Sequence, residues 1–175
     1  TVTLYIDGQP VGTATVLPDG SYEVTVSPGH SLVDGPHSVT VTFMDSAGNE
    51  SPQSPALDII IDTEAPNAIA IDTPITPDNI VNAVEQLTLV ITGTGAEPTS
   101  TVEVTLTDSL GNLIGPLTAT VNPDGTWSIP ATDISSLVDG PITITTSETD
   151  AAGNPNVPVT ASFLLDTTAP TAAPN

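Results

Sequence analysis

The chain has 175 residues, contains neither Lys nor Arg, and carries 21 Asp and Glu residues, so its formal net charge is −21. Nucleic acids and anionic membrane surfaces are bound mainly through Lys and Arg, so this composition argues against both as partners. The absence of Cys excludes disulfides, thiol nucleophiles and cysteine-ligated zinc. The chain is 38% hydrophobic and rich in Val, Ile, Leu and Thr, which favours a folded protein over a disordered one.

The first 65 residues predict several short strands. Apolar side chains alternate with polar ones at residues 2–6, 22–26 and 39–43, and clusters of Gly, Pro, Asn and Asp separate these runs. A period of two between turn residues is typical of half-buried β-strands. We expect Tyr22 to anchor the core of this part.

The rest of the chain predicts further strands, and no long segment has helical periodicity. We place the strands at residues 67–72, 86–92, 101–107, 113–121, 126–131, 142–149 and 157–165. Asp124 and Gly125 predict a tight hairpin turn before the strand at 126–131. Trp127, the only Trp of the chain, is the expected core anchor.

An internal repeat of about 104 residues organises the chain. Four motifs occur twice in the same order: PDG, LVDGP, D-x-A-G-N and D-T-x-A-P. The first copies begin at Pro18, Leu32, Asp45 and Asp62, and the second copies at Pro123, Leu137, Asp150 and Asp166. About seven short strands in such a unit predict an all-β fold of tandem immunoglobulin-like antiparallel β-sandwiches with Greek-key connections.

This repeat predicts the domain boundaries. Residues 1–65 form a partial domain, N-terminally truncated by two strands, residues 66–169 form a complete domain, and residues 170–175 begin the next linker or domain. The start TVTLYIDGQP has neither Met nor a basic leader, so we expect a piece of a longer protein. No apolar run reaches the roughly 18 residues of a membrane span, and we expect no direct membrane contact.

Several motifs together resemble one known family. VNAVE at residues 81–85, GTW at residues 125–127, D-x-A-G-N and D-T-x-A-P are similar to the consensus of bacterial Ig-like repeats in giant surface adhesins of the RTX type, which are exported by type I secretion. The resemblance covers the whole chain. It implies extender, or spacer, repeats that hold a distal binding domain away from the bacterial cell surface for adhesion or biofilm formation.

The resemblance also implies calcium ions at the domain junctions, an extracellular location, a monomeric rod, and neighbouring repeats of the same chain as the partners. The expected topology brings three loops to the pole that receives the linker at residues 62–66. Calcium takes six to eight oxygen ligands, and no basic side chain competes for these carboxylates. The expected ligands, led by Asp62 and Asp150, are Asp62, Glu64, Glu97, Asp124, Asp150 and Asn154.

The same residue types also make ordinary turns without any metal. That interpretation stays open for each carboxylate of the junction. It is the stronger one for a second acidic group expected at the opposite pole, which comprises Asp78, Asn79, Asp108 and Asp139.

Catalysis finds little support in the sequence. The two His residues, His30 and His37, both lie in the first part, and we expect them in loops or on the surface. No nucleophile elbow, P-loop or dinucleotide-binding glycine pattern is present. We therefore predict a protein that is not an enzyme. A module that binds carbohydrate or a host protein, and a subunit of an extracellular filament or surface layer, remain the alternatives to the spacer.

Overall fold

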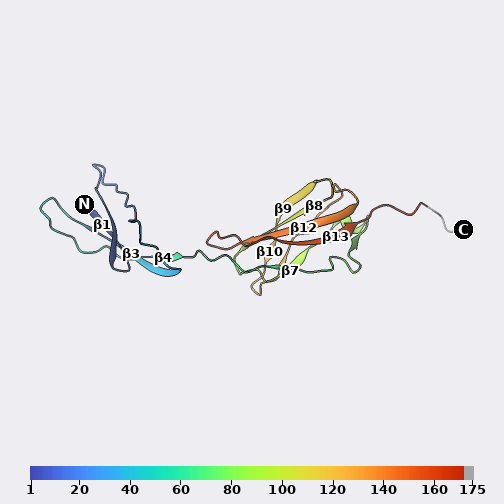
Figure 1. Cartoon of the computed structure of the whole chain (residues 1–175), viewed down its shortest axis with the longest axis horizontal. Coiled ribbons are helices and arrows are strands. Elements are labelled where there is room, and N and C mark those ends of the chain that lie inside the picture. The colour runs from blue at the N-terminus through green and yellow to red at the C-terminus, as the bar shows by residue number, and fades with distance from the viewer. Residues whose placement is uncertain (172–175) are drawn as a thin grey trace. The chain divides into compact units, whose positions relative to one another are not determined.

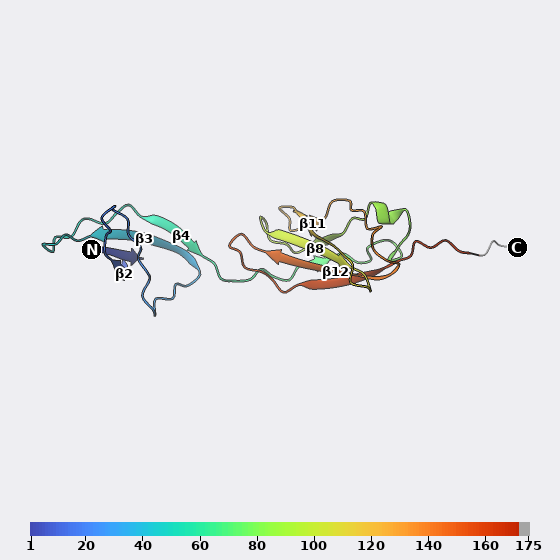
Figure 2. The ribbon, with the colours of Figure 1, turned by 90° about the horizontal axis from the view of Figure 1, so that it is seen from above.

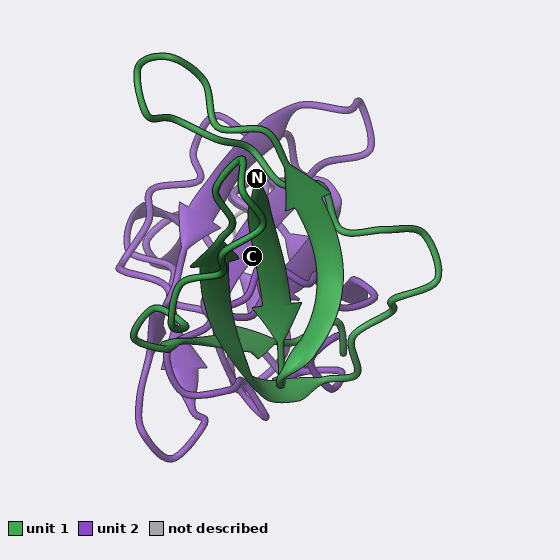
Figure 3. Ribbon diagram, turned by 90° about the vertical axis from the view of Figure 1, so that its left-hand side faces the viewer, with its two compact units in different colours: residues 1–64 green, residues 65–175 purple. Residues whose placement is uncertain are grey.

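The computed structural model of the chain describes residues 1–171. These divide into two compact units, unit 1 at residues 1–64 and unit 2 from Ala65 onward (Figures 1 and 3). The expected start of a further domain at residues 170–175 falls mostly outside the described residues.

Unit 1 contains one antiparallel sheet with the strand order β2-β1-β3-β4 (Figure 2). Its strands are β1 (Val2–Ile6), β2 (Gln9–Ala14), β3 (Gly35–Phe43) and β4 (Leu57–Ile61). Val2, Ile6 and Val11 are its buried hydrophobic residues. The expected strands at residues 2–6 and 39–43 are thus present.

The expected strand at residues 22–26 is wrong. This segment forms no ladder with another strand. It is held to β2 at its end instead, where Ser27 N–H donates to the Val11 carbonyl at 2.8 Å. Tyr22 is 41% exposed, not a core anchor, and it packs edge-on against Phe43 with ring centroids 5.7 Å apart. In unit 2 the equivalent segment joins a second sheet, and described unit 1 contains no such sheet for it to join.

Unit 2 is a sandwich of two sheets, with strand orders β6-β13-β12-β8-β9 and β10-β11-β7-β5. The strands are β5 (Ala70–Ile71), β6 (Ile80–Val81), β7 (Thr92–Thr94), β8 (Thr101–Thr107), β9 (Leu113–Thr118), β10 (Thr120–Val121), β11 (Trp127–Ser128), β12 (Gly140–Thr149) and β13 (Val159–Leu165). All pairings are antiparallel except β13 with β6, which is parallel.

The core of unit 2 lies between its two sheets. Alternate residues of β8 and β12 point inward, as the period of two predicted. Trp127 is the core anchor and is 1% exposed. Gly93 makes room for it, because a Cβ at this position would lie 2.2 Å from Trp127 Cζ2 and 2.0 Å from the Ala70 carbonyl oxygen.

The structure corrects the expected strand at residues 86–92. A 3-10 helix, η1 (Glu85–Leu87), stands there, and β7 starts only at Thr92. Local hydrogen bonds explain the turn: Asn82 Oδ1 accepts from Val84 N–H and Glu85 N–H, and Glu85 Oε2 accepts from Asn82 N–H. Such side-chain bonds compete with a sheet ladder, and apolar periodicity does not register them.

Candidate functional site

Three loops of unit 2 meet at one pole, as the expected topology required. Ala96 N–H donates to the Gly125 carbonyl at 3.0 Å, which joins the loop before β8 to the hairpin before β11. Glu97 N–H donates to Glu148 Oε1 at 2.6 Å, which joins the same loop to the end of β12. The loop at residues 150–154 follows directly. We call this end of unit 2 the loop pole.

Asp150 closes its own loop at this pole. Its Oδ1 accepts from the backbone N–H groups of Ala152, Gly153 and Asn154 at 2.9, 2.7 and 2.8 Å. Its Oδ2 accepts from Asn154 Nδ2 at 2.9 Å. The Asn154 amide and these N–H groups hold the pKa of Asp150 below its ordinary value, although burial opposes the shift. The structure therefore brings Asp150 and Asn154 together, as partners of one turn.

The same turn occurs at Asp45–Asn49 and at Asp108–Asn112. In both turns the Asp carboxylate accepts from the backbone N–H of the Asn and from its Nδ2. The bond from Nδ2 is 2.8 Å long at Asp45 and 2.7 Å long at Asp108. Burial raises the pKa of Asp108, but its bonds with Asn112, Val138 and Leu110 outweigh it and lower the pKa to about 2. Asp108–Asn112 is a third copy of this turn that was not expected from the sequence, although its residues D-S-L-G-N carry the same pattern. D-x-x-G-N is thus a self-contained turn motif.

The other expected ligands also lie in local turns. Asp124 Oδ1 accepts from Thr126 Oγ1 at 2.7 Å and from Thr126 N–H at 3.0 Å, and these bonds lower the pKa of Asp124. In unit 1, Asp62 Oδ1 accepts from Glu64 N–H at 3.2 Å. Within residues 1–171, no three His, Cys, Asp or Glu side chains gather closely enough to hold a metal ion.

Glu148 is the residue of the loop pole that sequence reasoning missed. It is fully buried and lies on the inward face of β12 in line with Ile142 and Ile144. Its Oε1 accepts from Glu97 N–H, but its Oε2 has no hydrogen-bond partner. Asn156, whose Oδ1 accepts from Glu148 N–H at 2.8 Å, also has a buried Nδ2 without a partner. Period two predicts this burial, since residues 142, 144, 146 and 148 share one face.

The donor set at the loop pole fits a hard cation in its chemistry. It consists of carboxylate, amide and hydroxyl oxygens, which calcium prefers. The chain has no Lys or Arg to neutralise a buried carboxylate, and a buried charge without a partner is costly. The buried, unpartnered Glu148 Oε2 is the observation that favours a cation here.

At the other end of each unit, a carboxylate fastens the outgoing chain. Asp34 accepts from Thr63 N–H at 3.2 Å and from Thr63 Oγ1 at 2.9 Å. Asp139 accepts from Thr167 N–H at 3.1 Å and from Thr167 Oγ1 at 2.8 Å. We call these pairs the carboxylate latches. Both connect the Asp of LVDGP to the Thr of D-T-x-A-P, so two repeated motifs form one structural device.

The second expected acidic group forms no cluster of three carboxylates among residues 1–171, although Asp108 accepts from Val138 N–H, beside Asp139, at 3.0 Å. Asp78 Oδ1 accepts from Thr76 Oγ1 and Ile80 N–H, both at 3.1 Å. Asn79, with φ of 61°, donates from Nδ2 to the Ser162 carbonyl at 3.1 Å. These two residues therefore shape the turn that delivers β6 to β13, while Asp108 and Asp139 serve a separate turn and latch.

The structure also corrects the placement of His37. This residue lies within β3 and is 8% exposed, so it is neither a loop nor a surface residue. His30 is exposed in a loop, as expected. Among residues 1–171, no helix is both long and apolar enough to cross a membrane.

The comparisons with known proteins agree with this architecture. Residues 1–63 match the family model of a bacterial Ig-like domain. The chain is 36% identical to a tetra-tandem repeat in the extending region of a large adhesion protein, with a TM-score of 0.52 over 96% of this chain and 42% of that one. No curated protein matches the sequence.

Two further solved structures are similar. A Ca2+-stabilized adhesin that helps an Antarctic bacterium reach out and bind ice is 30% identical, with a TM-score of 0.47 over 97% of this chain and 40% of that one. Fibronectin(III)-like modules of Clostridium thermocellum CbhA are 16% identical, with a TM-score of 0.52 over 95% of this chain and 77% of that one. The last likeness concerns the fold alone. The chain spans less than half the length of the two adhesin chains.

Proposed function

We propose that the chain is an extender segment of a bacterial cell-surface adhesin, because residues 1–63 match a bacterial Ig-like domain and the chain is similar to the extending region of a large adhesion protein. In this role the repeats hold a distal binding domain away from the cell, for adhesion or biofilm formation, and the protein reaches the surface by type I secretion. The segment has no catalytic activity of its own, and its partners are neighbouring repeats of the same chain.

The observation that carries this proposal is the likeness to an extending region over 96% of the chain at 36% identity. The internal repeat supports it, because a spacer grows by adding equivalent units. The composition supports it as well. Only five aromatic residues are present, and the one Trp is in the core, whereas ligand-binding surfaces are enriched in aromatic side chains.

The carboxylate latch of unit 1 supports a stiff connection between repeats. Thr63 is fastened to Asp34, while Pro66 is buried and Ile69 belongs to the core of unit 2. Only Glu64 and Ala65 lie between Thr63 and Pro66, and Pro66 has a fixed φ. So short a free segment leaves little conformational freedom.

We further propose that calcium stiffens the array. The proposed ligands are those expected from the sequence, namely Asp62, Glu64, Glu97, Asp124, Asp150 and Asn154. A bound calcium ion would supply positive charge where the chain has none. Binding to the folded state raises stability through mass action, and removal of calcium leaves the carboxylates to repel one another.

A thermal melt of the chain with calcium and with excess chelator tests the calcium proposal. Asp150→Asn and Asp108→Asn form a matched pair, since each alters a D-x-x-G-N turn but only Asp150 lies at the loop pole. Both variants should melt at a lower temperature than the natural chain. Only Asp150→Asn should lose most of the calcium-induced rise. An identical melting temperature of the natural chain in calcium and in chelator would contradict the proposal.

A further inference from the structure

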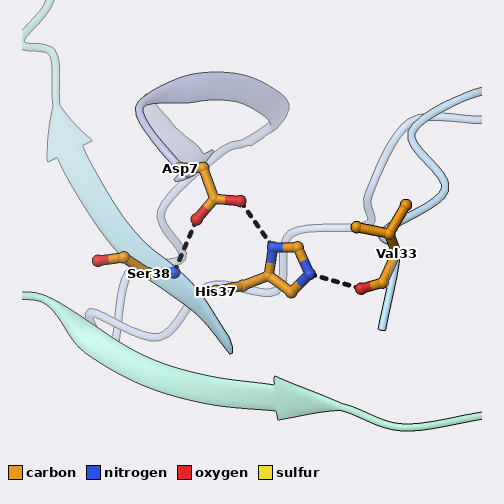
Figure 4. A network of polar contacts seen from close by, with 4 residues as sticks. All are labelled: Asp7, Val33, His37 and Ser38. Atoms are coloured by element: carbon orange, nitrogen blue, oxygen red, sulfur yellow. Dashed lines mark hydrogen bonds and ion pairs between the residues drawn. The ribbon is translucent and has the colours of Figure 1, made fainter. Parts of the chain in front are cut away.

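His37 joins three parts of unit 1 (Figure 4). Its Nδ1 lies 2.6 Å from Asp7 Oδ2, in the turn between β1 and β2. Its Nε2 lies 2.7 Å from the carbonyl oxygen of Val33, in the loop that leads into β3. His37 is a residue of β3 and is almost fully buried, at 8% exposure.

Both ring nitrogens thus face acceptors. A backbone carbonyl has no proton to give. Asp7 is an acceptor too, because the Ser38 N–H bond to its Oδ1 at 2.9 Å and then the His37 ring lower its pKa and keep the carboxyl group ionised. A neutral imidazole carries one N–H and can satisfy one of the two contacts, whereas the imidazolium carries two and satisfies both. The geometry therefore requires a protonated ring.

The charged groups around His37 are few. The β1–β2 turn contributes Asp7, and the preceding loop contributes His30, which lines the same pocket, and Asp34, which is bonded to Thr63. On β4, the residue opposite His37 is Ile59, and Asp58 pairs with Ser38. With no Lys or Arg in the chain, Asp7 is the only charge in direct contact with the ring among the described residues.

The loop at residues 29–33 borders a pocket of about 310 Å³ that is open to solvent. Ile6, Val11 and Leu32 contribute apolar side chains to its lining, while Asp7, His30 and His37 contribute polar ones. The same position in unit 2 is Ile142, which pairs with Phe163 as His37 pairs with Ile59. Unit 1 therefore has a titratable group where unit 2 has a core hydrocarbon.

We propose that His37 is a proton-operated clamp that fastens the loop at residues 29–33 to the sheet of unit 1. The clamp is closed while the imidazole is protonated and opens when the ring loses its proton, because one of the two acceptors then faces a bare nitrogen. Release of the Val33 carbonyl then frees the loop from the sheet. This device is independent of calcium and of the spacer role.

The electrostatics agree in direction. The Val33 carbonyl and then the Asp7 carboxylate raise the pKa of His37 above its ordinary 6.5. A raised pKa in the folded state stabilises unit 1 fully below pH 6.5, and this contribution is lost as the pH rises through the folded-state pKa. The Ser38 N–H and then His37 lower the pKa of Asp7 below 3.8. The stability that Asp7 contributes to unit 1 is therefore present above pH 3.8 and is lost only as the pH falls through the lowered pKa.

Titration of the His37 ring by NMR in the full chain tests the proposal, with the same ring in the urea-unfolded chain as the reference. We expect His37 to titrate at higher pH in the folded chain than in the unfolded one. As the ring loses its proton, the backbone amides of residues 29–33 should become more mobile on the ps–ns timescale, which NMR relaxation measures. The amides of β8 and β12 in unit 2 should keep their order parameters.

Two variants separate the clamp from a merely structural role. Asp7→Asn keeps an acceptor for Ser38 and suits the left-handed φ of 51°, so it should fold and shift the His37 titration to lower pH. His37→Ile, which copies Ile142, should make the mobility of the loop amides independent of pH. The proposal is overturned if His37 titrates in the folded chain at or below its pH in the unfolded chain, or if the loop mobility does not follow its titration.

Discussion

At the scale of single residues, the carboxylates of this chain act first as acceptors for backbone N–H groups. Asp45, Asp108 and Asp150 each organise a D-x-x-G-N turn, and Asp34 and Asp139 fasten the outgoing chain. Most of these residues lie in motifs that the sequence singles out, but the sequence alone could not separate a turn residue from a calcium ligand. Turns and calcium loops use the same residue types, so spacing alone does not distinguish them.

Glu148 illustrates the opposite case. The expected strand at residues 142–149 includes Glu148, and the alternation of β12 places this residue on the inward face. What the sequence could not give is its environment, since Glu97 lies 51 residues away in the chain. Such long-range contacts arise only when the two sheets pack together.

A pH prediction follows for Asp108. Its lowered pKa stabilises unit 2 above pH 3.8, and this contribution is lost as the pH falls towards about 2. Asp108→Asn should therefore flatten the loss of stability between pH 4 and 2, measured as urea midpoints. Leu110→Ala changes an exposed residue of the same turn and should keep the natural slope. Equal slopes in Asp108→Asn and the natural chain would refute this assignment.

Among the elements, alternation predicted the long strands and the short strand β1, and it failed at residues 22–26 and for most of 86–92. β8 matches its expected range, 101–107, because seven residues of strict alternation leave no competing structure. Residues 22–26 alternate equally well, but a strand also needs a neighbour, and that neighbour is absent from described unit 1. The all-β class and the resemblance to bacterial Ig-like repeats are confirmed, because many short motifs carry that signal together.

A substitution at Gly93 tests how β7 packs in the sandwich. A methyl group here would overlap both the Ala70 carbonyl and the Trp127 ring, so Gly93→Ala should destabilise unit 2 by at least about 2 kcal/mol. Thr94→Ala, at an exposed position of the same strand, is the control and should stay within about 0.5 kcal/mol. Urea unfolding followed by Trp127 fluorescence reports unit 2 alone. A natural midpoint for Gly93→Ala would mean that β7 does not pack as described.

In the whole molecule, the carboxylate latches fasten the chain at the point where it leaves each repeat. Thr63→Val removes the hydroxyl that bonds Asp34, so the amides of Thr63 and Glu64 should become more mobile on the ps–ns timescale. NMR relaxation of these amides measures the change. Thr13→Val, on an exposed strand position, should leave them unaltered. Unchanged order parameters in Thr63→Val would show that the latch does not restrain the linker.

Small-angle X-ray scattering of the chain shows whether calcium stiffens the proposed spacer. The measurement compares the maximum particle dimension in calcium with that in excess chelator, at equal ionic strength, because a chain of net charge −21 also responds to screening. A spacer stiffened by calcium should have a longer, narrower distribution of dimensions in calcium than in chelator. An identical distribution in both conditions, or a more compact one in calcium, would contradict it.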